Sequence, residues 1–232
     1  MKRNHWLFRS AAILVIAIGL FVVFSGAAAR AGGVVGDGTP SSCTETALTS
    51  ALSGGGTVTF NCGGPATILL LNPKDITQST VLDGGNVITL TGGLATRLLR
   101  VDPAASLALS NITLDSAFSN NGSGGAIWSG GSLTMTHVTV QNSKTALQSC
   151  GGALLVAGNT TIVDSTFTAN VAGLGGGAIC VRSQPDTQVE VSDSRFMNNQ
   201  AVDTTTGYGG AIYVEYGSAI VHDSVFLFNS AH

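Results

Sequence analysis

The stretch that decides the fold is Gly-Gly-Ala-Ile at residues 124–127, because close copies of it return three times along the chain. The copies are Gly-Gly-Ala-Leu at 151–154 and Gly-Gly-Ala-Ile at 176–179 and 209–212, so that successive copies lie 27, 25 and 33 residues apart. Repeats of this length indicate units that cannot bury an apolar face alone and that stack on their neighbours to form one continuous core.

A second element follows each of the last three copies and reads Asp-Ser-x-Phe-x-x-Asn, at residues 164–170, 193–199 and 223–229. Weaker versions occur at 137–140 and 111–114, and the large apolar positions of all five lie 26, 27, 29 and 30 residues apart. We expect these apolar side chains to stack inside the fold, and the asparagines to hydrogen-bond along their own column. The apolar column is Leu114, Val140, Phe167, Phe196 and Phe226, and the asparagine column is Asn170, Asn199 and Asn229.

Short alternating runs lie between the two elements, at residues 133–135, 161–163, 189–191 and 219–221. A period of two indicates strands, so that each repeat holds about three strands divided by turns. The prediction is an all-β fold, a right-handed single-stranded parallel β-helix in which each coil adds one rung at about 4.8 Å. Paired glycines allow positive φ and close backbone approach at a corner of each coil.

The composition agrees with this fold and argues against nucleic acid as a partner. Charged residues make up 10% of the 232 residues and aromatic residues 6%, whereas the chain has 31 glycines. That mixture suits short strands joined by tight turns. Four of the ten basic residues lie in the first 30 positions, which leaves six basic against 13 acidic residues and a formal charge of −7. Phosphate binding needs a basic face.

Residues 1–31 are predicted to be a signal peptide that sends the protein out of the cell or to the cell surface or outer membrane. Lys2, Arg3 and Arg9 precede the apolar run 11–24, and Ala29-Arg30-Ala31 fits a cleavage site. The run has 14 residues, which is short for a membrane span of about 20. The alternative is an uncleaved signal anchor. The remaining residues, 32–232, are predicted to form one β-helix domain.

Residues 32–62 are predicted to cap the first coil. In residues 43–52, Ala47, Leu48, Ala51 and Leu52 share one helical face, and glycines at 54–56 end the helix. A short helix laid over the first coil would shield its apolar end. Export permits disulfides, and Cys43 and Cys62 flank this segment, so that we expect them to pair; two free buried thiols are the alternative.

The pairing of Cys150 with Cys180 stays open at this stage. In the expected register Cys150 lies five strand positions from the residue stacked on Cys180. That is about 16 Å, too far for a disulfide unless the chain folds back between them.

The repeats over residues 124–232 resemble the GGA[ILV] and FxxN repeats of the chlamydial polymorphic outer membrane proteins, and similar repeats occur in bacterial surface proteins of pectin-lyase-like fold. The resemblance implies a parallel β-helix at a cell surface and an adhesin-like role. The opening through Cys43, a helix, a strand and Cys62 is also similar to the start of secreted bacterial β-helix proteins. This sequence stops at His232 within the repeat. We therefore expect an uncapped last coil, either because the gene product is truncated, which we favour, or because the coil self-associates there.

One column of polar residues is a candidate metal site. Asp164, Asp193 and Asp223 occupy the same repeat position, and His137 and Asn111 continue their column. Unpaired carboxylates about 5 Å apart repel one another, and a calcium ion would relieve that repulsion. The alternative, which we favour, is that each aspartate caps its own turn.

An outward stripe is a candidate binding surface. If the residue after each Gly-Gly-Ala points inward, alternation turns Trp128, Leu155, Cys180 and Tyr213 outward, with Tyr216 nearby. Such a stripe suits a carbohydrate or a host or cell-surface protein. The alternative, which we favour, is cover by a neighbouring loop or a scatter of unrelated apolar residues on the surface.

The sequence contains no recognisable set of catalytic residues. Glycoside hydrolysis needs two placed carboxylates, and the basic residues after position 31 are scattered: Lys74, Arg97, Arg100, Lys144, Arg182 and Arg195. We therefore assign no catalytic residue and no required cofactor, and expect a non-catalytic secreted or cell-surface protein with a role in adhesion or envelope structure. The alternative is a polysaccharide lyase or glycoside hydrolase, or a truncated fragment of one.

Overall fold

A computed structural model describes residues 32–182, 187–203 and 207–232. The signal peptide expected at residues 1–31, with its cleavage site after Ala31, lies outside the described residues. In the described part of the chain no helix is long and apolar enough to cross a membrane.

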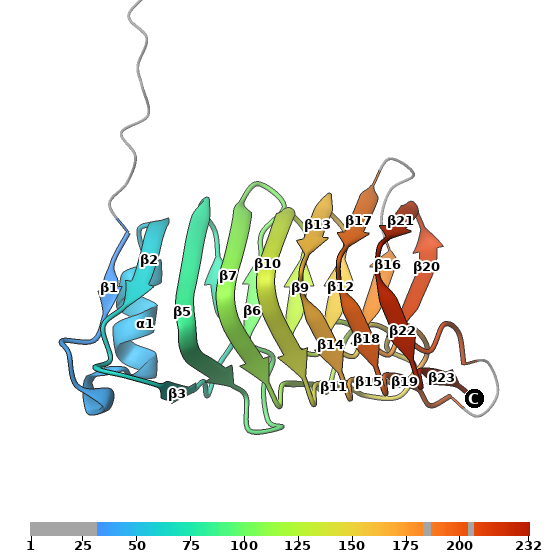
Figure 1. Ribbon diagram of the computed structural model, residues 1–232, viewed down its shortest axis with the longest axis horizontal. Helices are drawn as coiled ribbons and strands as arrows, with labels where there is room; N and C mark the ends of the chain where they lie inside the picture. The colour runs from blue at the N-terminus through green and yellow to red at the C-terminus, as the bar shows by residue number, and fades with distance from the viewer. Residues whose placement is uncertain (1–31, 183–186, 204–206) are drawn as a thin grey trace, which may run out of the picture.

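The chain forms a right-handed parallel β-helix, as the repeats predict. In the described residues its strands make three parallel sheets of twelve, six and five strands (Figure 1). The twelve-stranded sheet holds β1 (Val34–Val35), β2 (Gly56–Phe60), β3 (Ala66–Leu69), β5 (Thr80–Thr91), β7 (Ser106–Asp115), β10 (Ser132–Gln141), β13 (Thr160–Val163), β14 (Thr166–Thr168), β17 (Gln188–Ser192), β18 (Arg195–Met197), β21 (Ser218–His222) and β22 (Val225–Leu227).

The six-stranded sheet lies behind it in the view of Figure 1 and carries the candidate site described below. Its strands are β4 (Lys74–Ile76), β6 (Leu99–Val101), β9 (Ile127–Ser129), β12 (Leu154–Val156), β16 (Ile179–Arg182) and β20 (Ile212–Tyr216). The five-stranded sheet holds β8 (Phe118–Ser119), β11 (Lys144–Thr145), β15 (Val171–Ala172), β19 (Gln200–Ala201) and β23 (Ser230–Ala231).

The apolar column is confirmed. Strand register places Leu114, Val140, Phe167, Phe196 and Phe226 directly above one another. The Phe196 ring lies between two others, with centroid distances of 4.9 Å to Phe167 and 4.7 Å to Phe226. Equivalent side chains of successive repeats therefore stack on one another, and each coil covers the apolar interior of the coil before it.

The asparagine column is also confirmed and forms a hydrogen-bonded ladder. Asn199 Oδ1 accepts from the backbone N and the Nδ2 of Asn170, at 3.1 and 3.0 Å. Asn199 Nδ2 donates to Asn229 Oδ1 at 2.9 Å and to the carbonyl of Phe167 at 3.0 Å. Asn170 and Asn199 are fully buried, so that their hydrogen bonds form where water cannot substitute.

The two glycines of each Gly-Gly-Ala copy form a corner of the coil, as the sequence predicts. The first glycine of each copy has positive φ, for example +68° at Gly151. The second glycine lies where two coils touch, because a Cβ at Gly152 would sit 2.2 Å from the carbonyl oxygen of Gly177. A side chain at either position would push the coil out of register.

The helix α1 (Glu45–Leu52) lies over the N-terminal end of the β-helix, where it was expected (Figure 1). Thr44 caps it by accepting a hydrogen bond from the Ala47 N–H at 3.2 Å, and Leu48 and Leu52 join the core. The expected disulfide between Cys43 and Cys62 is present, with a Cα–Cα distance of 5.7 Å.

The last described coil leaves its apolar interior open. Phe226 is 43% exposed although its equivalents Phe167 and Phe196 are fully buried, and Val221 is 39% exposed.

Candidate functional site

One cleft lies on the outer face of the six-stranded sheet and holds about 560 Å³. Its floor is a column of outward side chains set by strand register, in which Arg100 of β6 pairs with Trp128 of β9, and Trp128 with Leu155 of β12. Arg182 of β16 lines the cleft as well. A volume of this size is typical of sites for small ligands.

Two loops form the walls of the cleft. The first precedes Gly124 and contributes Asn121, Gly122 and Ser123 to the lining. The second precedes Gly151 and contributes Gln148 and Ser149. The loops are tied together, because the Cys150 N–H donates to Ser123 Oγ at 3.0 Å and the Gly124 N–H donates to the Cys150 carbonyl at 2.9 Å.

A disulfide joins Cys150 to Cys180, with a Cα–Cα distance of 5.6 Å, and it answers the question of pairing that the sequence left open. The positive φ of Gly151 reverses the chain so tightly that a Cβ there would lie 2.0 Å from the carbonyl oxygen of Leu154. The chain therefore folds back at the glycine corner and lays Cys150 over the outer face of β16. The second wall is thus attached covalently to the sheet.

The predicted outward stripe exists in register but not as one exposed surface. Trp128, Leu155, Cys180 and Tyr213 form one outward column. Leu155 is only 7% exposed and Cys180 is fully buried, because with Cys150 they form a small second core. The expectation of a continuous exposed stripe is therefore wrong for these two residues, and cover by a neighbouring loop is the reason.

The aromatic residues of the stripe divide into two groups. Trp128 is half-buried and lines the cleft, and its ring lies against the backbone, since a Cβ at Gly130 would be 2.8 Å from the ring atom Cη2. Tyr213 stacks on Tyr208 with a centroid distance of 5.2 Å, and Tyr216 is 60% exposed on the same strand. Neither Tyr213 nor Tyr216 lines the cleft. Of the predicted binding residues, Trp128 and Leu155 belong to the cleft.

The arginines of the cleft were missed by sequence reasoning, which treated them as scattered. Arg97, Arg100 and Arg182 all line it. Arg97 reaches the first wall, where Nε donates to the Gly124 carbonyl and Nη2 to Ser119 Oγ and the Ser123 carbonyl, each at 2.8 Å. Burial, and then the neighbouring charge of Arg100, lowers the pKa of Arg97, although an arginine stays protonated at neutral pH. No motif in the sequence signalled them, because Leu99-Arg100-Val101 pairs with Ile127-Trp128-Ser129 in the structure but no Gly-Gly-Ala precedes it.

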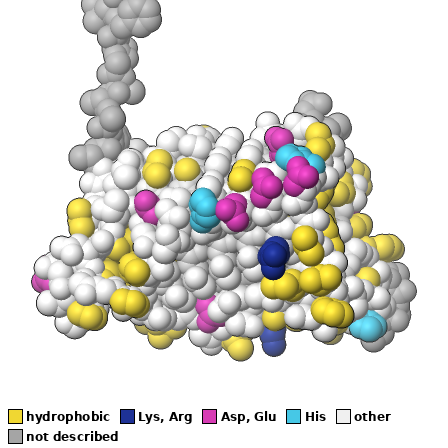
Figure 2. Space-filling model, viewed as in Figure 1, with side chains coloured by type: hydrophobic (Ala, Val, Ile, Leu, Met, Phe, Trp, Pro, Cys, Tyr) yellow, Lys and Arg dark blue, Asp and Glu magenta, His cyan; other side chains and the backbone are white. Residues whose placement is uncertain are grey.

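The aspartate column lies on the other side of the molecule, along the twelve-stranded sheet. Figure 2 shows acidic and histidine side chains in a band across this face. Register stacks Asp164, Asp193 and Asp223 as predicted, with His137 and Asn111 continuing the column, and all five have positive φ. Asp and Asn tolerate this left-handed conformation better than most residues do, which accounts for their recurrence at the bend.

The geometry gives no support to a metal at this column. Within the described ranges, no group of three His, Cys, Asp or Glu side chains is placed to hold a metal ion. Asp164 instead accepts from His137 Nε2 at 2.8 Å. This contact joins two neighbouring coils, so that the favoured alternative, in which each aspartate caps its own turn, stays a prediction.

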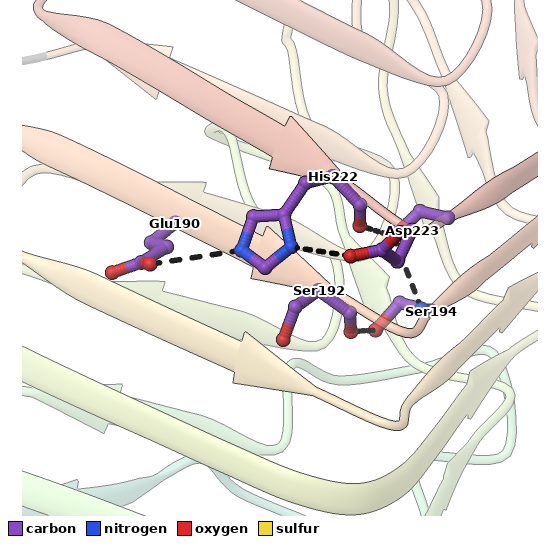
Figure 3. A network of polar contacts seen from close by, with 6 residues as sticks. Glu190, Ser192, Ser194, His222 and Asp223 are labelled. Carbon is purple, nitrogen blue, oxygen red and sulfur yellow. Dashed lines mark hydrogen bonds and ion pairs between the residues drawn. The ribbon is translucent and has the colours of Figure 1, made fainter.

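A histidine network at the C-terminal end of this band is the second candidate for chemistry (Figure 3). His222 Nδ1 lies 3.1 Å from Asp223 Oδ2, and Nε2 lies 3.7 Å from Glu190 Oε1. The hydrogen bond to Asp223, followed by the charges of Asp223 and Glu190, raises the pKa of His222. Because both ring nitrogens face carboxylates, neither is placed to take a proton from a serine such as Ser192 or Ser194. The network is an exposed ion-pair cluster.

Two comparisons with known proteins agree with the fold. Residues 75–231 match the family described as "Right handed beta helix region". The probable autotransporter YfaL of Escherichia coli (strain K12) is 34% identical over 131 residues, which take in 50% of this chain and 10% of that protein. This chain therefore spans about a tenth of the length of the curated relative that it matches. Because the family match covers well over half of its residues, the chain belongs to the right-handed β-helix family.

Proposed function

We propose that this protein is a non-catalytic β-helix, secreted or held at the cell surface, that binds a carbohydrate chain in the cleft beside Trp128 and so serves adhesion or envelope structure. The observation that carries the proposal is the Trp128 ring, which is held against Gly130 within a cleft of about 560 Å³. An aromatic ring offers a flat apolar face to the C–H groups of a sugar, and the surrounding side chains offer hydrogen bonds to its hydroxyls.

The absence of paired carboxylates favours binding over cleavage. Glycoside hydrolysis uses two carboxyl groups on either side of the scissile bond. Among the described residues, Asp102 is the only carboxylate that lines the cleft. A carbohydrate-active enzyme remains the second candidate because the same cleft would take its substrate.

Two disulfides and one relative support a location outside the cytoplasm. Cys43–Cys62 and Cys150–Cys180 both need an oxidising compartment to persist. The relative is named a probable autotransporter, which fits an exported protein. The signal peptide proposed at residues 1–31 would supply the route. Sequencing the N-terminus of the protein recovered from the medium or the cell surface tests this part, and a protein found only in the cytoplasm would contradict it.

A glycan array probed with the purified protein tests the binding role. Trp128→Ala and Gln148→Ala should each weaken binding at least tenfold, and Gln148 is an exposed loop residue whose loss leaves the core intact. Tyr216→Ala is the matched control, because Tyr216 is an exposed aromatic on β20 outside the cleft. The proposal fails if no saccharide binds, or if Tyr216→Ala weakens binding as much as Trp128→Ala. Release of shortened or unsaturated saccharides from a bound polymer would move the protein to the enzyme class.

A further inference from the structure

The first wall of the cleft contains the pair Asn121-Gly122, and the sequence has no second Asn-Gly pair. Asparagine followed by glycine is the pair most prone to deamidation, because glycine has no side chain to keep its backbone nitrogen away from the preceding amide. The nucleophile is the Gly122 nitrogen, and the group that it attacks is the side-chain carbonyl of Asn121. The sequence therefore supplies both reacting groups at one point of this wall.

The fold leaves both reacting groups unrestrained. Asn121 is exposed and lines two hollows, the cleft and a smaller one of about 100 Å³, so that its amide is open to water. Within residues 32–182, 187–203 and 207–232, neither the Asn121 side chain nor the Gly122 N–H has a hydrogen-bond partner. A Cβ at Gly122 would meet only Arg97 Nη2, at 3.7 Å, so that no distant backbone packs against this residue.

Two Asp-Gly pairs, which can undergo the same ring closure, lie at residues 37–38 and 83–84 and are restrained. In the first pair, the glycine N–H donates to the Asn61 carbonyl at 2.7 Å, which occupies the attacking nitrogen. In the second pair, the aspartate Oδ1 accepts from the Gly85 N–H and from Asn111 Nδ2, each at 3.0 Å. A Cβ on the glycine of this second pair would lie 2.6 Å from the Asn111 carbonyl oxygen, so that the backbone there has no room to move.

We propose that Asn121 is a modification site that deamidates spontaneously in the folded protein. The Gly122 nitrogen loses its proton to hydroxide and forms a bond to Asn121 Cγ, the Cγ–Nδ2 bond breaks, and ammonia leaves behind a five-membered succinimide. Water then opens the ring at either of its two carbonyl carbons. One opening gives aspartate, and the other gives isoaspartate, in which the backbone runs through the side-chain carbon. The two steps consume one water and release one ammonia, with no oxidation or reduction.

The product changes the wall of the cleft. Asp102 is the one carboxylate that lines the cleft among the described residues, and deamidation places a second carboxylate on its first wall. The isoaspartate form also adds one carbon to the backbone of this wall. Arg97 holds both ends of the segment, since Nη2 donates to Ser119 Oγ and to the Ser123 carbonyl at 2.8 Å each, so that residues 120–122 must take up the added length. The reaction needs no ligand and is therefore independent of the proposed binding role.

Incubation of the purified full chain at mildly alkaline pH, beside a sample at mildly acidic pH, tests the reaction. Trypsin then releases residues 101–144 as one peptide, in which Asn111 and Asn142 are internal controls because their Nδ2 groups donate to Asp83 and Asp115. Fragmentation of this peptide in a mass spectrometer locates the gain of about 1 Da.

Asn121 should deamidate at least tenfold faster than either control asparagine, faster at alkaline than at acidic pH, and to a mixture of aspartate and isoaspartate. An unchanged Asn121, or equal rates at the three asparagines, would overturn the proposal. Aspartate as the single product would show direct hydrolysis by water and refute attack by the Gly122 nitrogen.

Gly122→Ala is the matched variant, because the added Cβ contacts only the flexible end of Arg97. It should slow the reaction at least tenfold, and an unchanged rate would refute the part assigned to the glycine. A second measurement needs no variant and compares the native protein with the same chain unfolded in urea. The two rates at Asn121 should agree within tenfold, and a larger slowing in the folded protein would show that the wall protects this asparagine and overturn the proposal.

Discussion

Replacing both Cys150 and Cys180 by alanine should lower stability and also loosen the cleft, whereas replacing Cys43 and Cys62 should lower stability alone. The first pair is separated by 30 residues and the second by 19. From loop-closure entropy, these cross-links stabilise the folded chain by about 3.6 and about 3.2 kcal/mol respectively at 25 °C. The two double variants are therefore nearly matched in their expected loss of stability.

The two double variants differ in which part of the protein the lost disulfide holds in place. Cys150–Cys180 attaches the wall containing Gln148 and Ser149 to β16, whereas Cys43–Cys62 lies in the N-terminal cap. Urea unfolding measures the two losses of stability. Hydrogen exchange at the Gly124 and Cys150 amides, which bond across the two walls, measures the wall itself.

In conditions where both double variants stay folded, we expect these two amides to lose protection only in Cys150→Ala/Cys180→Ala, together with a weaker affinity for the saccharide that the glycan array identifies. Unchanged protection in that variant would refute the reasoning, since the wall would then keep its position without the cross-link. The same loss of protection in Cys43→Ala/Cys62→Ala would show a general loosening of the β-helix instead of a local one.

Three further predictions concern the ladder, the bends and the surface. Asn199→Ala removes four hydrogen bonds, three of them buried, and should lower the free energy of unfolding by about 3–5 kcal/mol in urea. Asn229→Ala at the half-exposed end should cost about 1–2 kcal/mol, and equal costs would contradict the importance of burial. Ala169 has a φ of +54°, so that Ala169→Gly should stabilise the protein by about 0.5–1 kcal/mol, and a loss of stability in thermal unfolding would count against strain at this bend. His222 has a raised folded pKa, so that its stabilising contribution is complete below the unfolded value of 6.5 and is lost as the pH rises through the folded pKa. An NMR titration of His222 should give a midpoint above 6.5, and His222→Asn should remove this pH dependence of stability; a midpoint at or below 6.5 would refute the ion-pair network.

The repeat made the coil core predictable from sequence. Phe167, Phe196 and Phe226 recur at a nearly constant interval, and one register satisfies them and the asparagines together. Such agreement between independent columns leaves few alternative folds. The capping helix was also predictable, because its apolar face and its glycine stop are local signals.

The cleft was not predictable to the same degree, because it depends on loops and on coils that lack the repeat motif. Arg97 and Arg100 lie in a coil without Gly-Gly-Ala, so that their register could not be carried back from Trp128 by motif alone. The Cys150–Cys180 disulfide depends on a reversal of the chain at Gly151, and counting residues along an extended strand does not predict this reversal. Spacing measured along an extended strand overestimates distance wherever a glycine turns the chain.

The position of the two wall loops has a consequence for how this architecture changes over evolutionary time. Each loop leaves the coil after the five-stranded sheet and returns at a glycine corner whose backbone hydrogen bonds fix the next strand. Insertions or deletions between the five-stranded sheet and the glycine corner change the walls of the cleft and leave the stacked core unchanged. Homologous β-helices with the same stacked core can therefore differ in the shape and chemistry of this cleft through changes confined to a few surface residues.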